Sequence, residues 1–224
     1  MKRKIITTSD GSKTIHIEEW NEQYHSVHGA IQEANHVFIK HGLLFYLETF
    51  HKTSPVHILE IGFGTGLNAF LTLITSNDLK LSVNYVGVEA YPVKKEEINQ
   101  LNYAELISTK DKVYFEDLHE LAWETSKNIT SNFKLEKQEK FFKDIDALNA
   151  FDIIYFDAFG ARVQPELWTE SIFEIMYKAL NSNSVLVTYS AKGSVRRAMQ
   201  AVGFIVERLP GPPGKREMLR AIKR

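Results

Sequence analysis

The segment HILEIGFGTGLNAF, residues 57–70, restricts the fold of this chain more than any other stretch. The apolar run over residues 56–62 predicts a buried strand, and residues 67–76 follow with a helical pattern. Gly62, Gly64 and Gly66 stand between them, and glycines at such a turn let the backbone approach a ligand closely. The segment therefore predicts a ligand-binding α/β domain. Its candidate ligands are a dinucleotide, a nucleoside triphosphate and a nucleoside without phosphate.

The glycine spacing and a neighbouring acid narrow this choice. The third glycine stands one place earlier than in the dinucleotide fingerprint, and no lysine follows it as a triphosphate-binding loop requires. Glu60 precedes the loop, where it would repel a phosphate but suits a cationic or amine-bearing ligand. S-adenosylmethionine carries a sulfonium and an α-amino group and has no phosphate. The loop therefore favours this cofactor, with Glu60, Gly62, Gly64, Gly66 and Asn68 as predicted contacts.

Two further acids fit a nucleoside site. Glu89 ends the strand predicted at residues 83–90, in the region where a ribose-binding carboxylate is expected in nucleoside-binding α/β folds. This acid alone distinguishes NAD poorly from S-adenosylmethionine. For the adenine amine, Asp117 and Asp144 both remain candidates from their spacing. Asp144 would end a predicted strand at residues 141–145, next to the strand at 151–159.

Asp157 follows the large apolar residues of IIYF, at the carboxyl end of a predicted buried strand. Ligands of open α/β sheets lie at this edge, and an acid there is costly unless it is exposed or has a partner. A helix-capping role is less suitable, because GARVQPELW separates Asp157 from the next helix. We expect Asp157 to contact cofactor or substrate and to accept a proton from an amine acceptor.

Strands and helices alternate along most of the chain, which predicts a mostly parallel sheet with helices on both faces. The expected fold is a Rossmann-like class I S-adenosylmethionine-dependent methyltransferase with a seven-stranded sheet and an antiparallel C-terminal hairpin. Residues 51–224 form the expected methyltransferase domain, and residues 1–50 form strands and a helix that cap its pocket. The predicted strands are two within residues 1–20, then 56–62, 83–90, 141–145, 151–159, 184–190, 203–209 and 217–222, and the predicted helices are 37–50, 67–76, 92–108, about 116–130, 166–180 and 193–202.

Composition limits the class of protein. The 224 residues suit one α/β domain, and the absence of cysteine excludes disulfides and thiolate nucleophiles. No apolar run approaches the ~18 residues of a membrane span, and the N-terminus lacks a signal-peptide core. We therefore expect a soluble cytoplasmic protein. The net charge is −1, yet residues 192–224 hold nine basic residues against two acidic ones. Such asymmetry fits a polyanionic partner or, equally, a solvated basic face.

Several segments together resemble one family. FGTGLN, DAFGARVQPELWT, TYSAKGSVRRAMQAVGF and PGPPGKREML are similar to the methyltransferase half of the bifunctional tRNA wobble-uridine enzymes of the MnmC type. The resemblance runs from Tyr24 to the C-terminus. It implies methylation of 5-aminomethyl(-2-thio)uridine in tRNA to the 5-methylaminomethyl form, with S-adenosylmethionine as donor. It matches the three glycines to the cofactor loop and Glu89 to the ribose acid, and it favours Asp144 over Asp117 for adenine.

The chain departs from the family pattern at Ala161 and at Val163-Gln164, and the flavin-dependent oxidoreductase half is absent from this sequence. With tRNA as partner, the basic C-terminal segment, residues 192–224, supplies candidate phosphate contacts. Aromatic residues are candidates to stack on a base splayed out of the anticodon loop. We expect a monomer. We also expect no metal site, because the histidines of residues 25–36 lack metal-binding spacing. The candidate phosphate contacts are Arg196, Arg197, Lys215, Arg216 and Arg220, and the candidate stacking residues are Trp168, Phe159, Tyr189 and Tyr24.

Two other functions compete with this prediction. The same fold could transfer a methyl or aminopropyl group to a small amine or polyamine, which would favour an acidic surface. A module that binds nucleic acid without catalysis would tolerate a damaged glycine loop, whereas the loop here is intact.

Overall fold

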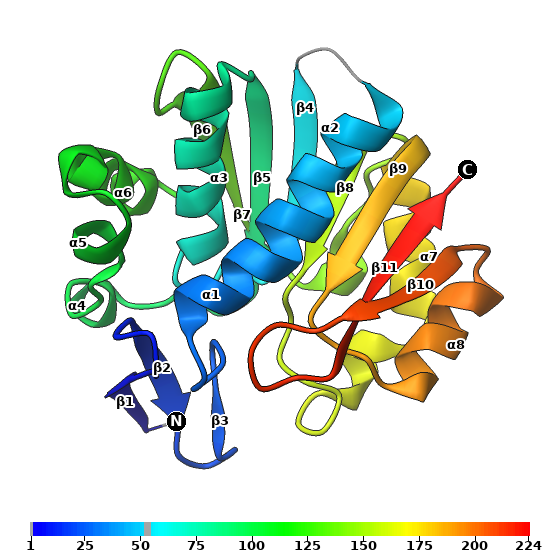
Figure 1. Ribbon diagram of the computed structural model, residues 1–224, viewed down its shortest axis with the longest axis horizontal. Coiled ribbons are helices and arrows are strands. Elements are labelled where there is room, and N and C mark those ends of the chain that lie inside the picture. The colour runs from blue at the N-terminus through cyan, green and yellow to red at the C-terminus, as the bar shows by residue number, and fades with distance from the viewer. Residues whose placement is uncertain (1, 52–54) are drawn as a thin grey trace.

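The computed structural model describes residues 2–51 and 55–224 and centres on a mostly parallel sheet (Figure 1). Its strand order in the described residues is β10-β11-β9-β8-β4-β5-β7-β6. The five central strands are parallel, whereas β6, β10 and β11 run antiparallel to their neighbours. The strands are β4 (Val56–Ile61), β5 (Val83–Glu89), β6 (Thr125–Asn128), β7 (Phe133–Glu139), β8 (Phe151–Phe156), β9 (Leu180–Thr188), β10 (Ile205–Pro210) and β11 (Glu217–Lys223).

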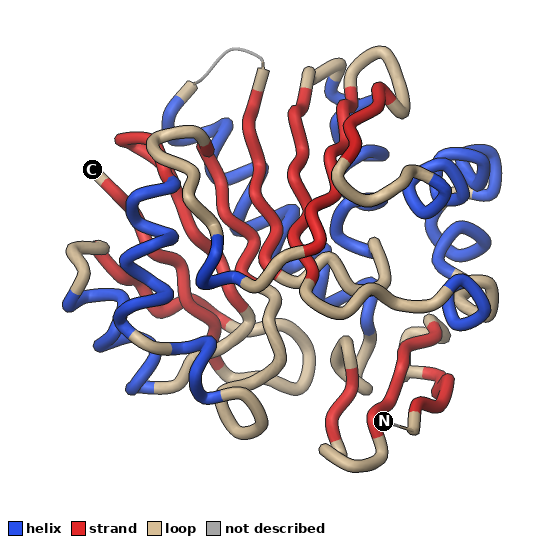
Figure 2. The backbone as a smooth tube through the Cα atoms, turned by 180° about the vertical axis from the view of Figure 1, so that it is seen from behind, coloured by secondary structure: helices blue, strands red, loops and turns tan. Residues whose placement is uncertain are grey.

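Helices cover both faces of this sheet, as the alternating sequence pattern predicted. The long helix over residues 30–50 and α3 pack on one face, and α7 and α8 lie on the other, which Figure 2 shows from behind. The longer helices are α1 (Ala30–Ala34), the π-helical stretch η1 (Asn35–Leu44), α2 (Phe45–Phe50), α3 (Leu67–Leu79), α6 (Lys112–Glu120), α7 (Glu170–Ala179) and α8 (Gly193–Ala201). The shorter helical turns are α4 (Lys95–Ile98), α5 (Tyr103–Ile107), η2 (Thr109–Asp111), η3 (Phe142–Asp144) and η4 (Pro165–Trp168).

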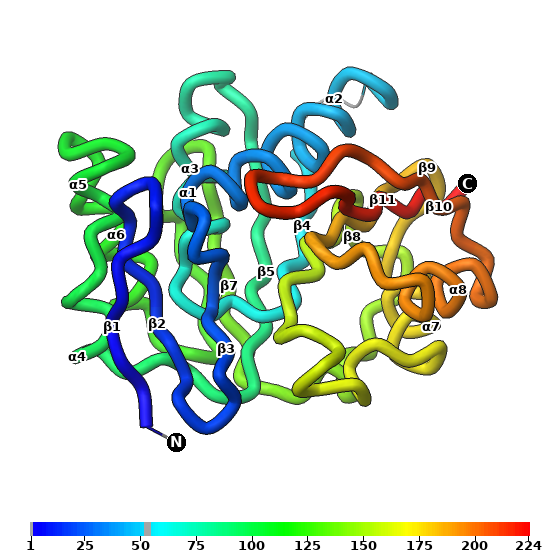
Figure 3. Tube along the Cα trace, turned by 60° about the horizontal axis from the view of Figure 1, so that its bottom comes forward, coloured from blue at the N-terminus to red at the C-terminus, as the bar shows by residue number. Residues whose placement is uncertain are grey.

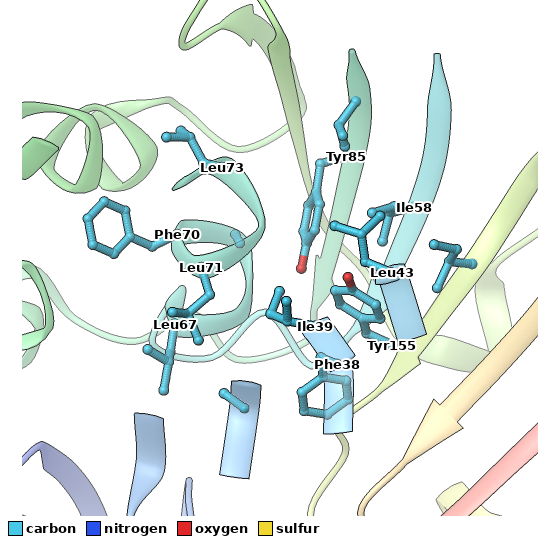
Figure 4. Packing of buried hydrophobic residues seen from close by; sticks show 14 of the residues in the cluster. Phe38, Ile39, Leu43, Ile58, Leu67, Phe70, Leu71, Leu73, Tyr85 and Tyr155 are labelled. Atoms are coloured by element: carbon cyan, nitrogen blue, oxygen red, sulfur yellow. The ribbon is translucent and has the colours of Figure 1, made fainter. Parts of the chain in front are cut away.

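Buried strands divide the core into two apolar layers. Every residue of β8 is buried, and its side chains alternate between the faces, so that Tyr155 joins one layer and Phe156 the other. Figure 4 shows the first layer, where Phe38 and Leu43 of the long helix meet Ile58 and Tyr155 of the sheet. This packing fixes the long helix across the sheet, and it thereby places the start of that helix near the carboxyl ends of the strands.

The C-terminal hairpin lies where the sequence predicted it, and its register determines where its loop falls. β11 inserts between β9 and β10, and Leu219 at the start of β11 pairs with Thr188 at the carboxyl end of β9. The loop over residues 211–216 consequently reaches the sheet edge at which parallel strands end. Figure 3 shows this loop beside the N-terminal end of α1.

The prediction for residues 116–145 was wrong in two places. The expected helix over 116–130 ends at Glu120, and Thr125–Asn128 forms the edge strand β6, which makes an eighth strand in the described sheet. The expected strand over 141–145 contains the short turn η3, and the true strand is β7, Phe133–Glu139. Lys137 occupies an inward position of β7 against the rings of Phe63 and Trp123, so a charge interrupts the apolar alternation that would have revealed the strand.

The N-terminus forms a separate small sheet of β1 (Arg3–Thr7), β2 (Lys13–Ile17) and β3 (Glu22–Gln23). The predicted pair of strands around the turn at Ser9–Ser12 is confirmed by the β1–β2 pairing. Asn102 holds this sheet through the backbone of Lys13 and Gly11. Residues 52–54, beside the predicted domain boundary, lie outside the described residues.

Candidate functional site

A cavity of about 1500 Å³ lies at the carboxyl ends of β4, β5 and β8. Chain order reverses at this point, because β5 and β7 follow β4 on one side and β8 lies on the other. Such a switch point is where open α/β sheets bind ligands. Residues of the glycine loop, of the segment after β5, of the segment after β8 and of the small sheet line the cavity, together with Gly214 and Lys215 of the C-terminal loop.

Gly62 shows why the first position of the loop requires glycine. Its φ is +90°, and a Cβ there would lie 2.8 Å from the backbone oxygen of Asp157. The loop and the end of β8 therefore touch through their backbones. Gly64 also lines the cavity, whereas Gly66 begins α3 and packs against the His119 ring outside the cavity lining.

Glu89 lies at the end of β5 and lines the same cavity. Its Oε2 accepts a hydrogen bond from the Gly64 amide at 3.1 Å, and its Oε1 accepts one from the Tyr91 amide at 3.0 Å. A carboxylate offers about four acceptor sites, so Glu89 keeps acceptor capacity for a hydroxyl donor beyond these backbone bonds. Burial raises the pKa of Glu89, while the backbone donors oppose this shift.

Asn68 connects two acids behind the cavity wall. Its Nδ2 donates to Glu60 Oε1 at 2.9 Å and to Asp157 Oδ2 at 2.8 Å. Glu60 is fully buried, and burial raises its pKa well above the ordinary value. Glu60 and Asn68 are absent from the cavity lining, so the structure places these two predicted cofactor contacts behind Asp157.

Asp157 lines the cavity directly after β8. Burial raises its pKa to about 7, and the negative charge of Glu33 adds to the shift, while Asn68 and Lys215 oppose it. A carboxyl group that titrates near neutral pH can exchange a proton with a ligand under working conditions. The sequence placed this residue correctly at the strand end.

The N-terminal segment contributes polar side chains to the cavity. His25 bonds Thr14 of β2 at 3.2 Å and Thr65 of the glycine loop at 3.5 Å, so it joins the small sheet to the loop. Burial lowers the pKa of His25 to about 4, and its ring is neutral near pH 7. Arg162, next to the family departure at Ala161, donates to the backbone oxygens of Trp20 and Asn21 and to Glu22.

The aromatic candidates separate into two groups. Phe159, Tyr24 and Tyr189 line the cavity, and the Phe159 ring stands edge-on to Tyr24 at 4.9 Å between centroids. Trp168 is buried, and its Nε1 donates to the Phe159 backbone oxygen at 2.8 Å. The structure thus gives Trp168 a packing position, and it is unavailable to stack on a base.

The basic candidates differ in exposure. Arg197 and Arg216 are exposed, and Lys215 lines the cavity. Arg196 is half-buried. Arg220 as a phosphate contact is wrong, because it is buried, pairs with Glu207 at 2.8 Å and lies 3.3 Å above the Phe45 ring.

The two adenine candidates lie outside the cavity lining. Asp117 is on α6 and pairs with Lys127 at 3.0 Å. Asp144 is exposed at the end of η3, and the expectation that it ends a strand beside β8 was wrong, because β8 pairs with β4 and β9. The preceding residues Phe142 and Lys143 do line the cavity, and sequence reasoning missed them because it treated them as strand.

Glu33 is a further cavity residue that sequence reasoning missed. It lies among the polar residues of α1, where an acid usually faces solvent. Within residues 2–51 and 55–224, no cluster of three or more metal-ligating side chains is present. The same residues contain no helix with the length and apolar content for a membrane span.

Comparison with known proteins assigns the family. A model described as S-adenosyl-L-methionine-dependent methyltransferase matches residues 102–224, more than half of the chain. The chain belongs to this methyltransferase family. S-adenosylmethionine is consequently the cofactor of this chain.

This methyltransferase is similar to proteins named tRNA 5-methylaminomethyl-2-thiouridine biosynthesis bifunctional protein MnmC. The protein of Hydrogenovibrio crunogenus is 28% identical over 210 residues, covering 89% of this chain and 31% of that protein. The protein of Cupriavidus metallidurans is 29% identical over 227 residues, covering 95% of this chain and 33% of that protein. The methyltransferase thus spans about a third of the length of the curated relatives it matches.

Solved structures support the same fold. MNMC2 from Aquifex aeolicus is 26% identical with a TM-score of 0.79, and the match covers all of this methyltransferase and 70% of that chain. Spermidine synthase from Thermotoga maritima is 15% identical with a TM-score of 0.56, covering 98% of this chain and 72% of that one, and it shows the fold alone. The predicted class I methyltransferase fold is confirmed.

Proposed function

We propose that this chain methylates the amine of 5-aminomethyl(-2-thio)uridine at the wobble position of tRNA. The observation that carries the proposal is Asp157, whose carboxyl faces the cofactor cavity and has a pKa of about 7. An alkylamine acceptor is protonated near neutral pH and must lose a proton before it attacks a methyl donor. The names of the relatives, which specify a methylaminomethyl product, supply the acceptor.

The cavity fits S-adenosylmethionine on its own geometry. Glu89 keeps acceptor capacity beyond its backbone donors, which suits a ribose hydroxyl, and Gly62 and Gly64 expose backbone to the remainder of the molecule. Phe142 and Lys143, after β7, line the same cavity as Glu89 and would hold the adenine, and Asp144 stays a proposed adenine contact. When bound, the cofactor supplies an electrophilic methyl group on its sulfonium.

Asp157 performs the proton chemistry in this proposal. The acceptor ammonium transfers one proton to an oxygen of Asp157, and the freed lone pair on nitrogen is then available for attack. The partly apolar cavity lowers the pKa of an amine that enters it, which brings the amine closer to that of Asp157. Asn68 holds the carboxylate in place through its bond to Oδ2.

The surface around the cavity supports an RNA partner. Lys192 lines the cavity and Arg197 and Arg216 are exposed on neighbouring segments, so these side chains suit phosphate contacts. Phe159, Tyr24 and Tyr189 offer ring faces or edges to a uracil that leaves its stack. We also propose that residues 1–50 cap the cofactor pocket. One chain supplies every described wall of the cavity, which supports action as a monomer, and tRNA as substrate supports a cytoplasmic location.

The deciding experiment incubates the protein with labelled S-adenosylmethionine and tRNA from cells that lack this methylation, followed by nucleoside digestion. Label in 5-methylaminomethyl(-2-thio)uridine is the expected result, and Asp157→Asn serves as the inactive control. A parallel reaction offers spermidine and putrescine, because spermidine synthases share the fold. Label in the polyamine arm with none in tRNA would contradict the proposal.

A further inference from the structure

An internal lysine occupies a well-formed ammonium site inside the cavity. Lys215 Nζ lies 2.5 Å from Glu33 Oε2, although 182 residues separate the two along the chain. The Glu33 side chain is only 8% exposed, and its other oxygen accepts the Ser26 amide at 3.1 Å. A carboxylate buried to this extent needs a cation beside it, because leaving it unpaired is expensive.

An aromatic face completes this site. Lys215 Nζ lies 3.9 Å from the centroid of the Tyr189 ring, within the range of a cation–π contact. The Tyr189 hydroxyl donates to the Ala158 backbone oxygen at 2.8 Å, which fixes the ring next to the end of β8. The ammonium thus contacts a carboxylate on one side and a ring face on another, and its aromatic wall is anchored one residue from Asp157.

The site belongs to the same cavity as the reaction centre. Glu33, Tyr189, Lys215 and Asp157 all line it. The charges of Glu33 and Lys215 both affect the pKa of Asp157, in opposite directions. A primary ammonium between Glu33 and Tyr189 therefore lies in the electrostatic range of the proposed proton acceptor.

We propose that Glu33 and the Tyr189 ring form the subsite for the primary ammonium of the acceptor, and that Lys215 fills this subsite until the acceptor enters. This inference rests on the proposed function, since it assigns the alkylamine a place beside Asp157. Exchange of one primary ammonium for another keeps Glu33 paired with a cation until the acceptor gives its proton to Asp157, so entry of the acceptor creates no unpaired buried charge. The displaced ammonium of Lys215, on its flexible stem, is then free to meet RNA phosphates.

The loop that carries Lys215 has other attachments. His36 Nε2 bonds the Pro210 backbone oxygen at 2.8 Å, and Gly214 packs so closely on the His28 ring that a Cβ there would lie 2.1 Å from it. These contacts hold the loop independently of the Lys215 charge. Lys215→Met therefore removes the internal ammonium from the subsite and leaves Glu33 and Tyr189 in place.

The test titrates the full chain with 13C-methylammonium and measures the binding of this probe by NMR. Lys215→Met should bind methylammonium at least about fivefold more tightly than the wild type, which keeps its internal competitor. Adding Tyr189→Leu or Glu33→Gln to Lys215→Met should abolish this gain. Lys178→Met is the matched control, since it removes a lysine that pairs with Glu174 on the surface of α7 at 2.7 Å. Equal methylammonium binding by wild type and Lys215→Met would overturn the inference.

A second measurement uses free 5-aminomethyluridine, which lacks phosphates, as methyl acceptor. Lys215→Met should lower KM for this nucleoside about fivefold with little change in kcat. A higher KM in Lys215→Met would show that Lys215 assists the acceptor directly, and the inference would be wrong. If neither the wild type nor any variant methylated nucleoside or tRNA, the proposed function would be contradicted. The methylammonium titration would still test the subsite, because it does not depend on methyl transfer.

Discussion

The side-chain amide of Asn68 donates to Asp157 Oδ2 over 2.8 Å, although the two residues stand 89 positions apart in the chain. The same nitrogen donates to Glu60 Oε1 over 2.9 Å. A neutral donor thus separates two buried acids that would otherwise repel each other when ionised. Asn68 is a positioning residue in this arrangement, because it orients Asp157 from behind the cavity wall and partly opposes the rise in pKa that burial causes.

Asn68→Asp should shift the pH dependence of methyl transfer. The substitution removes the amide donor and places a carboxyl group beside Asp157 and Glu60. The pKa of Asp157 should therefore rise by about one unit or more. At pH 7, kcat/KM should fall about fivefold or more, with recovery at higher pH. The pH profile of kcat/KM checks this outcome, and the affinity for S-adenosylmethionine serves as the control. A uniformly lower profile with unchanged shape would assign Asn68 a purely structural role.

Asp157→Asn should lower kcat by a factor of about 10²–10³, the usual contribution of a positioned general base. In the wild type, kcat/KM should rise with pH through an apparent pKa near 7, because only ionised Asp157 accepts the acceptor proton. An asparagine cannot titrate, so this rising limb should vanish from the profile of the variant. Persistence of the limb in Asp157→Asn would assign it to another group.

The pH dependence of the free energy of unfolding should also reveal the titration of Asp157. Its pKa is about 7 in the folded chain against an ordinary value of 3.8, so the folded state holds an additional proton between these values. The free energy of unfolding should therefore decrease as pH rises from about 4 to about 7, with a smaller decrease in Asp157→Asn. Chemical denaturation of both proteins across this range, without cofactor, gives the difference. Parallel curves would mean that Asp157 titrates normally.

Two basic residues on the same hairpin should separate RNA binding from stability. Arg216 is exposed, so Arg216→Gln should weaken tRNA binding, reduce the log–log salt slope by about one and leave the melting temperature unchanged. Arg220 pairs with Glu207 and covers the Phe45 ring, so Arg220→Gln should lower the free energy of unfolding by about 1–2 kcal/mol. Filter binding at several salt concentrations and thermal melts distinguish the two effects. A steep loss of tRNA affinity in a stable Arg220→Gln would reverse this assignment.

Local sequence patterns predicted the parts of the site that depend on one segment. The glycine loop, Glu89 and Asp157 each end a strand with strong apolar character, so their common edge follows from parallel pairing. β7 was missed because Lys137 takes an inward position and extends over aromatic rings, which hides the two-residue period. With β7 misplaced, the expected neighbourhood of Asp144 was also wrong.

Roles that depend on contacts between distant segments were beyond sequence reasoning. Lys215 was predicted as a phosphate contact on charge alone, and its pairing with Glu33 depends on how α1 and the C-terminal hairpin converge on one edge. Asn68 was predicted as a cofactor contact because it adjoins the loop. Its actual partners lie on β4 and after β8, which only the packed sheet brings together.

The backbone contact between the loop and β8 leads to a final prediction. Gly62→Ala should destabilise the chain by about 2 kcal/mol and weaken binding of S-adenosylmethionine, because alanine is strained at φ +90° and its Cβ would meet the Asp157 backbone oxygen at 2.8 Å. Gly160→Ala is the matched control in the same cavity, where the nearest atom to an added Cβ is the Tyr189 hydroxyl at an ordinary 3.6 Å. Calorimetric titration with S-adenosylmethionine and denaturant unfolding measure both effects. If Gly62→Ala bound the cofactor as well as Gly160→Ala, the close approach of the loop to β8 would have no part in forming the cofactor site.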